Sequence, residues 1–377
     1  MNDRLIGILG GGQLGRMLAL AGYPLGLRFR FLDPASDAPV RYLAEHIVAP
    51  YEDHLAVAQF GAGLTVATYE FENVPVATAR ALEQRVPVFP PPQALEVAQD
   101  RLAEKRFFTQ LHIPTAPFEP VDDRTSLDTA IARIGLPAVL KTRRLGYDGK
   151  GQALIRQHTD IDDAWRALGG QPLILEGFVS FVRELSILAV RGRDGAIAYY
   201  PLVENLHRNG ILYRSIAPAP SLTTDVQMLA ETYARRVLEA LDYVGVLAIE
   251  MFEVDASSVG ATGVRLLANE MAPRVHNSGH WTIEGAVTSQ FENHLRAITG
   301  LPLGDTSARG CAAMVNLIGS LPDAEMLLAL PDTHLHLYDK APRPGRKLGH
   351  VTVCAGDATR LAERLALVER YVPARTQ

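Results

Sequence analysis

The first hundred residues alternate short apolar runs with a stretch whose apolar residues recur at helical spacing. Apolar runs cover residues 5–9, 27–32, 64–69 and 86–89, and the helical pattern covers 13–22. Strands that alternate with helical crossovers are typical of a parallel α/β sheet. We therefore expect an N-terminal parallel-sheet domain over residues 1–100.

The pattern changes after the proline run at residues 90–92. A long helical pattern covers residues 93–112, and a proline-containing linker follows at 113–117. The next part is rich in predicted strands, at residues 138–141, 153–155, 172–176, 183–190 and 196–203. A helix at 225–243 then precedes two strands, 244–254 and 264–270, which we interpret as an antiparallel hairpin. These elements predict an α+β central domain over residues 101–300.

Short strands at residues 312–318, 334–338 and 350–354, closed by a helix at 359–371, predict a small β-rich C-terminal domain over 301–377. The hydrophobic fraction of 47% and charged fraction of 21% are ordinary for a globular protein. The formal charge of −5 argues against a nucleic-acid partner. No run reaches the roughly 18 apolar residues of a membrane span, and the N-terminus lacks a basic leader. The two cysteines are too few for a disulfide framework, which fits a reducing compartment. We therefore expect a cytoplasmic protein that is not bound to a membrane.

A glycine motif follows the first strand. Gly10, Gly12 and Gly15 match G-x-G-x-x-G, and Asp33 ends the next strand. This pattern is typical of a dinucleotide site, with a phosphate on the helix N-terminus and the acid on a ribose. An NAD-dependent oxidoreductase is therefore one hypothesis. A tight turn that packs helix on strand and a phosphate of another ligand are the two alternatives.

A second glycine cluster joins two strands between Lys141 and Gln152. Its three glycines, Gly146, Gly149 and Gly151, accompany Lys150. Such a loop can cover a triphosphate with backbone N–H groups while a lysine contacts the phosphates. The alternative is an ordinary β-turn with solvated charges.

Two carboxylates interrupt the apolar strands of the predicted hairpin. Glu250 follows residues 245–249, and Asn269 and Glu270 end the partner strand. Carboxylates are costly to bury unless they are paired or bound to a cation. The pair predicts a magnesium site that bridges substrate phosphates. A salt bridge to one of the many arginines is the alternative.

Two further segments gather polar and cationic side chains. Residues 273–281 contain Arg274, His276, Asn277 and His280, a density that predicts an anion-binding loop with an imidazole for proton transfer. Residues 338–350 carry four cations among prolines and glycines, which predicts an anionic ligand there. Only five of the 37 basic residues are lysines. Four of the five fall in the two cationic clusters, and Lys105 alone is expected on an ordinary helical face.

Together these motifs resemble the ATP-grasp superfamily and, within it, the N5-carboxyaminoimidazole ribonucleotide synthetase family. The matching blocks run through nearly the whole chain: residues 11–17, 69–75, 146–152, 205–207, 273–281, 290–292 and 343–347. The resemblance implies a Rossmann-like N-terminal domain, a central ATP-grasp domain and a small β-rich C-terminal domain. It also implies a homodimer.

The resemblance further implies a reaction in purine biosynthesis. ATP and bicarbonate give carboxyphosphate and ADP, and the amine of 5-aminoimidazole ribonucleotide captures the carboxyl group. ATP is expected to contact Arg101, Lys141, Gly146, Tyr147, Asp148, Gly149, Lys150, Gly151, Gln152, Glu176, Gly177, Phe178, Val179, Glu184, His207, Asn269 and Glu270. Mg²⁺ is expected between Glu250 and Glu270.

The acceptor side of the site is implied in the same way. Arg274, His276 and Lys347 are expected to handle bicarbonate and carboxyphosphate, with His276 as the proton-transfer group and Asp148 as a further catalytic residue. The ribonucleotide is expected to contact Gly12, Gln13, Leu14, Glu72, Tyr147, Asp148, Lys340, Arg346 and Lys347. Formate-dependent glycinamide ribonucleotide transformylase and biotin carboxylase share the ATP chemistry and remain alternatives, as does the NAD-dependent oxidoreductase.

Overall fold

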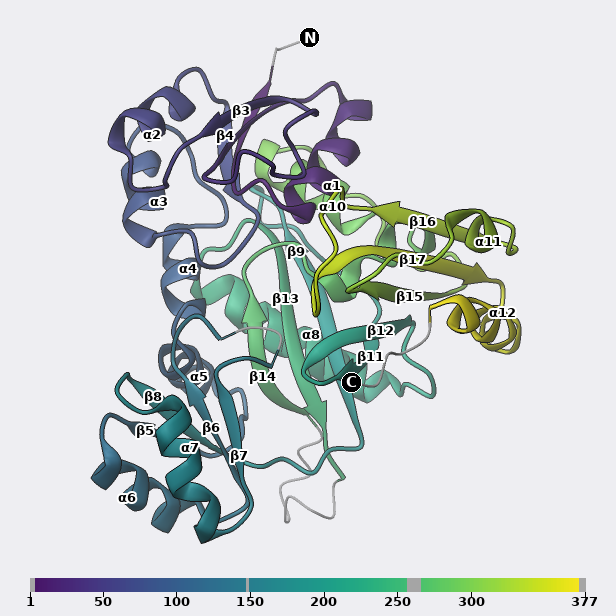
Figure 1. Cartoon of the computed structure of the whole chain (residues 1–377). Coiled ribbons are helices and arrows are strands. Elements are labelled where there is room, and N and C mark those ends of the chain that lie inside the picture. Colours follow the sequence, from purple (N-terminus) through teal and green to yellow (C-terminus); the bar gives the residue numbers. More distant parts are fainter. Residues whose placement is uncertain (1–3, 147–148, 256–265, 373–377) are drawn as a thin grey trace.

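The N-terminal part of the chain forms a four-stranded parallel sheet. The computed structural model describes residues 4–146, 149–255 and 266–372 (Figure 1). The strand order is β3-β2-β1-β4, and every pairing is parallel. The elements are β1 (Leu5–Leu9), α1 (Gln13–Gly22), η1 (Tyr23–Leu25), β2 (Arg28–Asp33), β3 (Glu45–Val48), α2 (His54–Gly61), β4 (Val66–Tyr69) and α3 (Val76–Glu83). The predicted parallel sheet is confirmed; the short, half-exposed edge strand β3 was missed.

The single helix predicted over residues 93–112 is wrong, because the chain forms two helices there. They are α4 (Pro92–Ala98) and α5 (Arg101–Gln110). Asp100 separates them, since its side chain accepts hydrogen bonds from the backbone N–H groups of Leu102 and Ala103 and so caps α5. Arg143 holds the same carboxylate through Nη2 at 2.8 Å. The break therefore ties the start of α5 to the segment that follows β6.

A second, antiparallel sheet of order β5-β8-β6-β7 forms a small lobe below the first (Figure 1). One apolar cluster packs helices α6 and α7 on this sheet. The strand pair β6–β7 brackets the second glycine cluster, as predicted. The elements are β5 (Phe118–Val121), α6 (Arg124–Ile134), β6 (Ala138–Thr142), β7 (Gln152–Ile155), η2 (His158–Asp160), α7 (Ile161–Leu168) and β8 (Leu173–Gly177).

The rest of the chain forms one large sheet. Its order is β14-β13-β9-β11-β12-β15-β17-β16, with β10 paired to β9. The predicted hairpin is confirmed, because β13 and β14 are antiparallel neighbours. The elements are β9 (Arg183–Arg191), β10 (Ile197–Tyr199), β11 (Val203–Arg208), β12 (Ile211–Ala217), α8 (Thr224–Ala240), β13 (Gly245–Glu253), β14 (Leu266–Ala272), η5 (Asn277–Gly279), α9 (Thr282–Gly285), α10 (Gln290–Thr299), β15 (Cys311–Ile318), α11 (Ala324–Leu328), β16 (Thr333–Leu337), β17 (Lys347–Ala355) and α12 (Ala358–Tyr371).

The C-terminal strands extend this large sheet, because β12 pairs antiparallel with β15. The division of the chain at residue 300 therefore stays a prediction. Within the described residues, no helix combines the length and apolar character that a membrane crossing requires.

One apolar core connects the three parts of the chain. The same cluster contains Leu14 of α1, Leu188 of β9 and Met314 of β15. A polar link accompanies it: His294 of α10 contacts Thr68 Oγ1 through Nε2 at 2.9 Å and accepts from the backbone N of Val246 through Nδ1 at 3.1 Å. The parts are thus packed against one another around the space in which the candidate site lies.

Candidate active site

Two adjoining cavities lie where the parts of the chain meet. Their volumes are about 760 Å³ and about 240 Å³. Both cavities are lined by Arg101, His207, Gly210, Glu250 and Glu270. Ligands in the two cavities would therefore meet at this pair of carboxylates.

The smaller cavity collects most of the residues predicted to bind ATP. Its lining includes Arg101, Lys141, Gly149, Gln152, Glu176, Gly177, Phe178, Val179, Glu184, His207, Asn269 and Glu270. Gly146 and Lys150 line the larger cavity instead, and Gly151 lines neither. Tyr147 and Asp148 lie outside the described residues, so their roles stay predictions.

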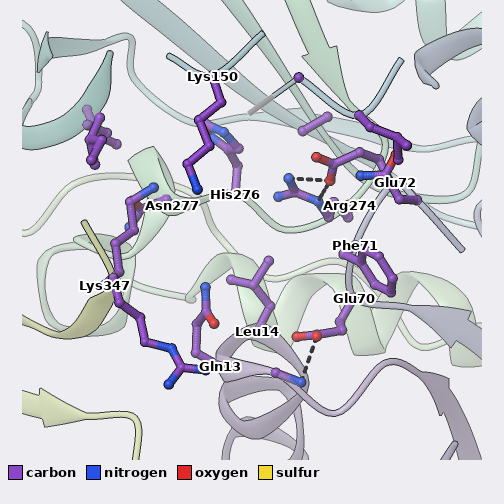
Figure 2. Close-up of a pocket in the computed structure, with 18 of the residues that line it drawn as sticks. Gln13, Leu14, Glu70, Phe71, Glu72, Lys150, Arg274, His276, Asn277 and Lys347 are labelled. Atoms are coloured by element: carbon purple, nitrogen blue, oxygen red, sulfur yellow. Dashed lines mark hydrogen bonds and ion pairs between the residues drawn. The ribbon is translucent and has the colours of Figure 1, made fainter. Parts of the chain in front are cut away.

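The larger cavity collects the residues predicted for the acceptor substrate and for bicarbonate. Its lining includes Gly12, Gln13, Leu14, Glu72, Arg274, His276, Lys340, Arg346 and Lys347. In Figure 2, the side chains of Lys150 and Lys347 extend into the same region of this cavity, close to His276. The fold thus brings together residues that are more than 300 positions apart in sequence.

Glu250 and Glu270 are direct cross-strand neighbours in the β13–β14 hairpin. Burial and the nearby charge of Glu270 raise the pKa of Glu250 to about 7. Burial acts in the same direction on Glu270, but the Arg101 guanidinium, with Nη1 2.8 Å from Oε2, holds the pKa of Glu270 below its ordinary value. The salt bridge to an arginine, which was the alternative to a metal site, thus exists at Glu270. Glu250 is left next to the like charge of Glu270.

These groups fit a divalent cation that is shared with substrate oxygens. Two carboxylates face one another, and the buried Oδ1 atom of Asn269 has no hydrogen-bond partner within the part of the chain that the structure describes. Among the described residues, no group of three or more histidine, cysteine or carboxylate side chains is arranged to hold a metal alone. Mg²⁺ commonly takes one or two protein carboxylates and completes its shell with water and phosphate oxygens.

Lys105 and Lys141 share one buried carboxylate. The Nζ atoms lie 3.4 Å and 3.0 Å from Glu176 Oε2. Burial opposes ionisation of Glu176, but the two ammonium groups lower its pKa to about 2. Its second oxygen, Oε1, is buried and has no hydrogen-bond partner in residues 4–146, 149–255 and 266–372, and the residue lines the smaller cavity.

The expectation that Lys105 lies on an ordinary helical face is wrong. Its side chain is 1% exposed and donates from Nζ to the carbonyl oxygen of Asn269 at 2.7 Å. The shortage of lysines in the sequence is the signal that could have indicated this role, as it did for the other four lysines. Lys105 therefore supports both Glu176 and the end of β14.

The predicted lid lies between β6 and β7, and residues 149–151 at its end form a turn. Gly149 and Gly151 have φ values of +76° and +71°, in the left-handed region that favours glycine. A Cβ on Gly151 would approach Thr142 Oγ1 to 2.5 Å. These glycines are thus required by the turn itself, whatever the turn covers.

His207 and Glu184 form a pair beside the smaller cavity. Nδ1 of His207 lies 2.8 Å from Oε2 of Glu184. Burial alone would lower the pKa of His207, but the hydrogen bond to Glu184 and the charge of Glu250 raise it. The raised pKa favours the protonated imidazole next to the shared carboxylates.

Arg274 is held by a residue from the N-terminal sheet. Its Nε and Nη2 atoms lie 2.6 Å and 2.5 Å from Glu72 Oε2, and Nη1 donates to the carbonyl oxygen of Val275 (Figure 2). Both partners were predicted to contact substrates, yet no motif indicated that they contact each other. An anion that binds Arg274 must share this guanidinium with Glu72.

His276 lies on the other side of the same loop. Its Nε2 atom is 3.2 Å from Glu250 Oε1, and Nδ1 is 2.9 Å from Ser278 Oγ. Burial, together with the charges of Arg274 and Lys347, lowers the pKa of His276 well below its ordinary value. The neutral imidazole thus lies at the edge of the carboxylate pair.

The backbone N–H groups of the N-terminal glycine loop donate hydrogen bonds to the carboxylate of Glu70, for which the sequence predicted no role. Glu70, which follows β4, accepts from Gly12 N at 2.6 Å and from Gly15 N at 2.8 Å (Figure 2). Glu70 lies beside the loop because the carboxyl ends of neighbouring parallel strands share one edge. A phosphate could take these two donors only by displacing Glu70, so phosphate binding by the glycine loop is not supported by this geometry.

Asp33 is likewise bonded within the protein rather than open to a ribose. Its Oδ2 accepts from Gly11 N at 2.8 Å and from Tyr51 Oη at 3.1 Å. The two hallmarks of the dinucleotide hypothesis are therefore used within the protein. Of the three interpretations of the loop, the structure agrees best with the tight packing of α1 on β1.

The C-terminal cations face the larger cavity. Its lining includes Lys340, Arg343, Arg346 and Lys347. Lys340 Nζ donates to Gln13 Oε1, so this segment contacts the glycine loop directly. Burial lowers the pKa of Lys340, although the nearby Glu70 opposes the shift. The array is thus a partly desolvated positive wall, as an anionic ligand requires.

Comparison with known domain families matches all three parts of the chain. The ribonucleotide synthetase preATP-grasp domain matches residues 3–99, the ATP-grasp domain matches 106–291, and the phosphoribosylaminoimidazole carboxylase C-terminal domain matches 312–364. The predicted fold class is therefore confirmed.

Individual proteins agree with this assignment. The N5-carboxyaminoimidazole ribonucleotide synthase of Pseudomonas aeruginosa is 54% identical over 369 residues, which cover 98% of this chain and 99% of the relative. The crystal structure of the synthetase from Thermus thermophilus is 58% identical, covers 99% of both chains and has a TM-score of 0.93. A structure from Aspergillus clavatus, in complex with ADP and 5-aminoimidazole ribonucleotide, is 32% identical over 98% of this chain and 99% of that chain, with a TM-score of 0.89. The chain belongs to the N5-carboxyaminoimidazole ribonucleotide synthase family of the ATP-grasp superfamily.

Proposed function

We propose that this chain catalyses the ATP-dependent carboxylation of 5-aminoimidazole ribonucleotide, a step of purine biosynthesis. As a family member, it is an ATP-dependent ligase. Bicarbonate and ATP give carboxyphosphate and ADP, and the ribonucleotide amine then takes the carboxyl group and releases phosphate. The observation that carries the proposal is the junction of two cavities at Glu250 and Glu270, since the reaction needs ATP and its acceptor side by side.

ATP would occupy the smaller cavity. Lys141 and Arg101 supply positive charge at its wall, and Asn269 offers an unsatisfied oxygen. Glu176, Gly177, Phe178 and Val179 would face the adenine, and Glu184 with His207 the ribose. The lid of Gly146, Tyr147, Asp148, Gly149, Lys150, Gly151 and Gln152 would cover the phosphates.

Mg²⁺ would be held by Glu250 and Glu270. Bound there, it would neutralise charge between the ATP phosphates and the two carboxylates. Arg101 keeps Glu270 ionised in advance, so one ligand is ready to bind a cation.

Bicarbonate and carboxyphosphate would lie near Arg274, His276 and Lys347. Both are oxyanions, so catalysis rests mainly on positioning and charge neutralisation. The ribonucleotide would occupy the rest of the larger cavity, against Gln13, Leu14, Glu72, Lys340 and Arg346. Tyr147 and Asp148 would hold its aminoimidazole. Because Glu70 occupies the Gly12 donor, the cationic wall is the better place for the ribonucleotide phosphate.

The assembly and the setting of the enzyme follow from the family resemblance. We propose a homodimer that acts in the cytoplasm. No nucleic-acid partner is proposed, in keeping with the net charge of −5.

One assay tests the function. ADP release from the full-length protein should require Mg²⁺, bicarbonate and 5-aminoimidazole ribonucleotide together, and omission of any one should reduce the rate to background. Turnover indifferent to bicarbonate, or replacement of the acceptor by glycinamide ribonucleotide with formate, would assign the chain a different ATP-grasp reaction.

A further inference from the structure

A buried chain of hydrogen bonds runs from the large sheet to the imidazole of His276. Ser215 Oγ contacts Asn205 Oδ1 at 2.7 Å, and Asn205 Nδ2 contacts Ser186 Oγ at 3.0 Å. Ser186 Oγ lies 2.8 Å from Ser278 Oγ, which lies 2.9 Å from His276 Nδ1. Ser186, Ser215 and Ser278 are fully buried, and Asn205 is 5% exposed. Because these groups are buried, each bond in the chain constrains the next.

The contacts of His276 determine which groups donate and which accept along this chain of hydrogen bonds. The backbone N of Ser278 donates to His276 Nδ1 at 3.3 Å. A backbone N–H can only donate, so in this geometry Nδ1 accepts and carries no proton. At 3.3 Å this bond is long and weak, so the tautomer also depends on the second group that contacts Nδ1. The Ser278 hydroxyl, which contacts the same nitrogen, must therefore donate to it as well.

The remaining members satisfy that direction one after another. Ser278 Oγ gives its proton to His276, so it accepts from the Ser186 hydroxyl. Ser186 in turn accepts from an N–H of the Asn205 amide, and the amide oxygen accepts from Ser215. Ser186 and Ser278 each donate once and accept once, Ser215 donates to the amide oxygen, and the amide orientation follows from the network.

With Nδ1 unprotonated, a neutral His276 carries its proton on Nε2. That atom lies 3.2 Å from Glu250 Oε1 and on the wall of the larger cavity. We propose that Ser186, Asn205 and Ser278 are positioning residues that lock His276 in the Nε2–H tautomer, so that it meets an oxyanion as a hydrogen-bond donor.

This inference rests on the proposed function for the identity of the oxyanion, which would be bicarbonate or carboxyphosphate. The tautomer itself does not depend on that identity. A protonated Nε2 cannot accept a proton, and Nδ1 is enclosed by Ser278. On this proposal His276 orients the oxyanion, and the amine proton leaves to the phosphate that the reaction releases.

Nitrogen-15 NMR of histidine-labelled, full-length protein reads the tautomer directly. In the wild type, the His276 signals, assigned by comparison with His276→Gln, should show a proton coupled to Nε2 and an unprotonated Nδ1. Ser186→Ala removes the donor to Ser278 and should allow a partial Nδ1–H population. Asn205→Asp replaces a donor with an acceptor, which reverses the chain and should raise that population further. A wild-type Nδ1–H signal, or an unchanged tautomer in both variants, would overturn the proposal.

Kinetics provide the second measurement. Ser186→Ala should lower kcat about fivefold to tenfold, the range expected for one hydrogen bond, and leave the KM for ATP unchanged. The matched control is Thr352→Val. It removes a buried hydroxyl that lies outside both cavities and has no hydrogen-bond partner among the residues described. It should alter neither the tautomer nor kcat. If Ser186→Ala shifts the tautomer and kcat stays at the wild-type value, the positioning role is excluded.

The two proposals fail separately. If the wild type did not require bicarbonate or the ribonucleotide, the proposed function would fall, while the NMR result would still decide the tautomer. Because Asn205→Asp places a charge in a buried site, Ser186→Ala decides the question if the former variant does not fold.

Discussion

Glu250 and Glu270 lie directly opposite one another on β13 and β14, yet their pKa values are displaced in opposite directions. Arg101 accounts for the difference, because its guanidinium contacts Glu270 and not Glu250. A bound cation would relieve the repulsion between the two carboxylates. The hairpin therefore holds one ionised ligand in place and a second that a cation would help to ionise.

The first prediction concerns Glu270→Gln. The amide keeps the shape of the side chain but removes the charge that pairs with Arg101 and that would hold Mg²⁺. We expect ADP release to fall at least about 100-fold, because a metal supplies several kcal/mol of charge stabilisation. Thermal unfolding should show that the variant folds. Glu96→Gln, which breaks the exposed Arg80–Glu96 pair, is the control and should retain activity. Near-normal turnover of Glu270→Gln would refute the metal assignment.

How much of the site could be read from the sequence depends on how local each feature is. The hairpin carboxylates and the glycine turn were identified, because each is a short motif within one or two neighbouring strands. The Arg274–Glu72 pair could not be derived, since its partners are 202 positions apart and meet only through the packing of two parts of the chain. The Glu70 contact with the glycine loop spans 58 positions and depends on β4 lying next to β1 in the parallel sheet.

The missed elements have a similar cause. Residues 93–112 form a continuous helical pattern, and the break at Asp100 is stabilised by Arg143, more than 40 positions away. Lys105 looked ordinary because its position in α5 shows helical spacing, whereas its burial depends on β14 and Glu176. The Asp100 cap is a local signal that Arg143 reinforces, whereas the burial of Lys105 depends on long-range partners alone.

The second prediction concerns Lys347→Arg. Lys347 begins β17 and extends into the larger cavity beside His276 (Figure 2). Arginine keeps the charge but is planar and longer, so it should not fit the same position in a partly desolvated site. We expect kcat/KM for bicarbonate to fall about tenfold or more, with little change in the KM for ATP. Arg166→Lys, at an exposed ion pair with Asp163, controls for the exchange of one cation for another. A fully active Lys347→Arg enzyme would remove this lysine from the proposed site.

The third prediction concerns Lys105→Met. Methionine fills a similar volume but leaves Glu176 with only Lys141, and the Asn269 carbonyl oxygen loses its donor. Removal of one partner from a buried ion pair costs about 3–5 kcal/mol of unfolding free energy. Urea unfolding should show this loss, whereas Arg166→Met at the surface should change stability by less than about 0.5 kcal/mol. A loss below about 1 kcal/mol would mean that Lys105 is not required to hold Glu176.

The fourth prediction concerns stability at acid pH. His294 joins the N-terminal sheet to β13 through Thr68 and Val246, and burial lowers its pKa to about 3. The unfolded chain, with an ordinary histidine pKa of about 6.5, binds the proton more readily than the folded chain. The stability from the neutral imidazole is therefore complete above pH 6.5 and is lost as the pH falls below that value.

Between pH 7.5 and 5.5, His294 alone should remove about 1.4 kcal/mol of unfolding free energy. Urea unfolding at the two pH values measures this loss. His294→Gln should be less stable than the wild type at pH 7.5 but should lose about 1.4 kcal/mol less on acidification. Thr68→Val removes a partner and keeps the imidazole buried, so it should retain the wild-type pH dependence. His294→Gln lacks the imidazole that takes up a proton on unfolding, so its stability should depend less on pH. If the variant and the wild type lost the same stability on acidification, the buried neutral histidine would not be the cause.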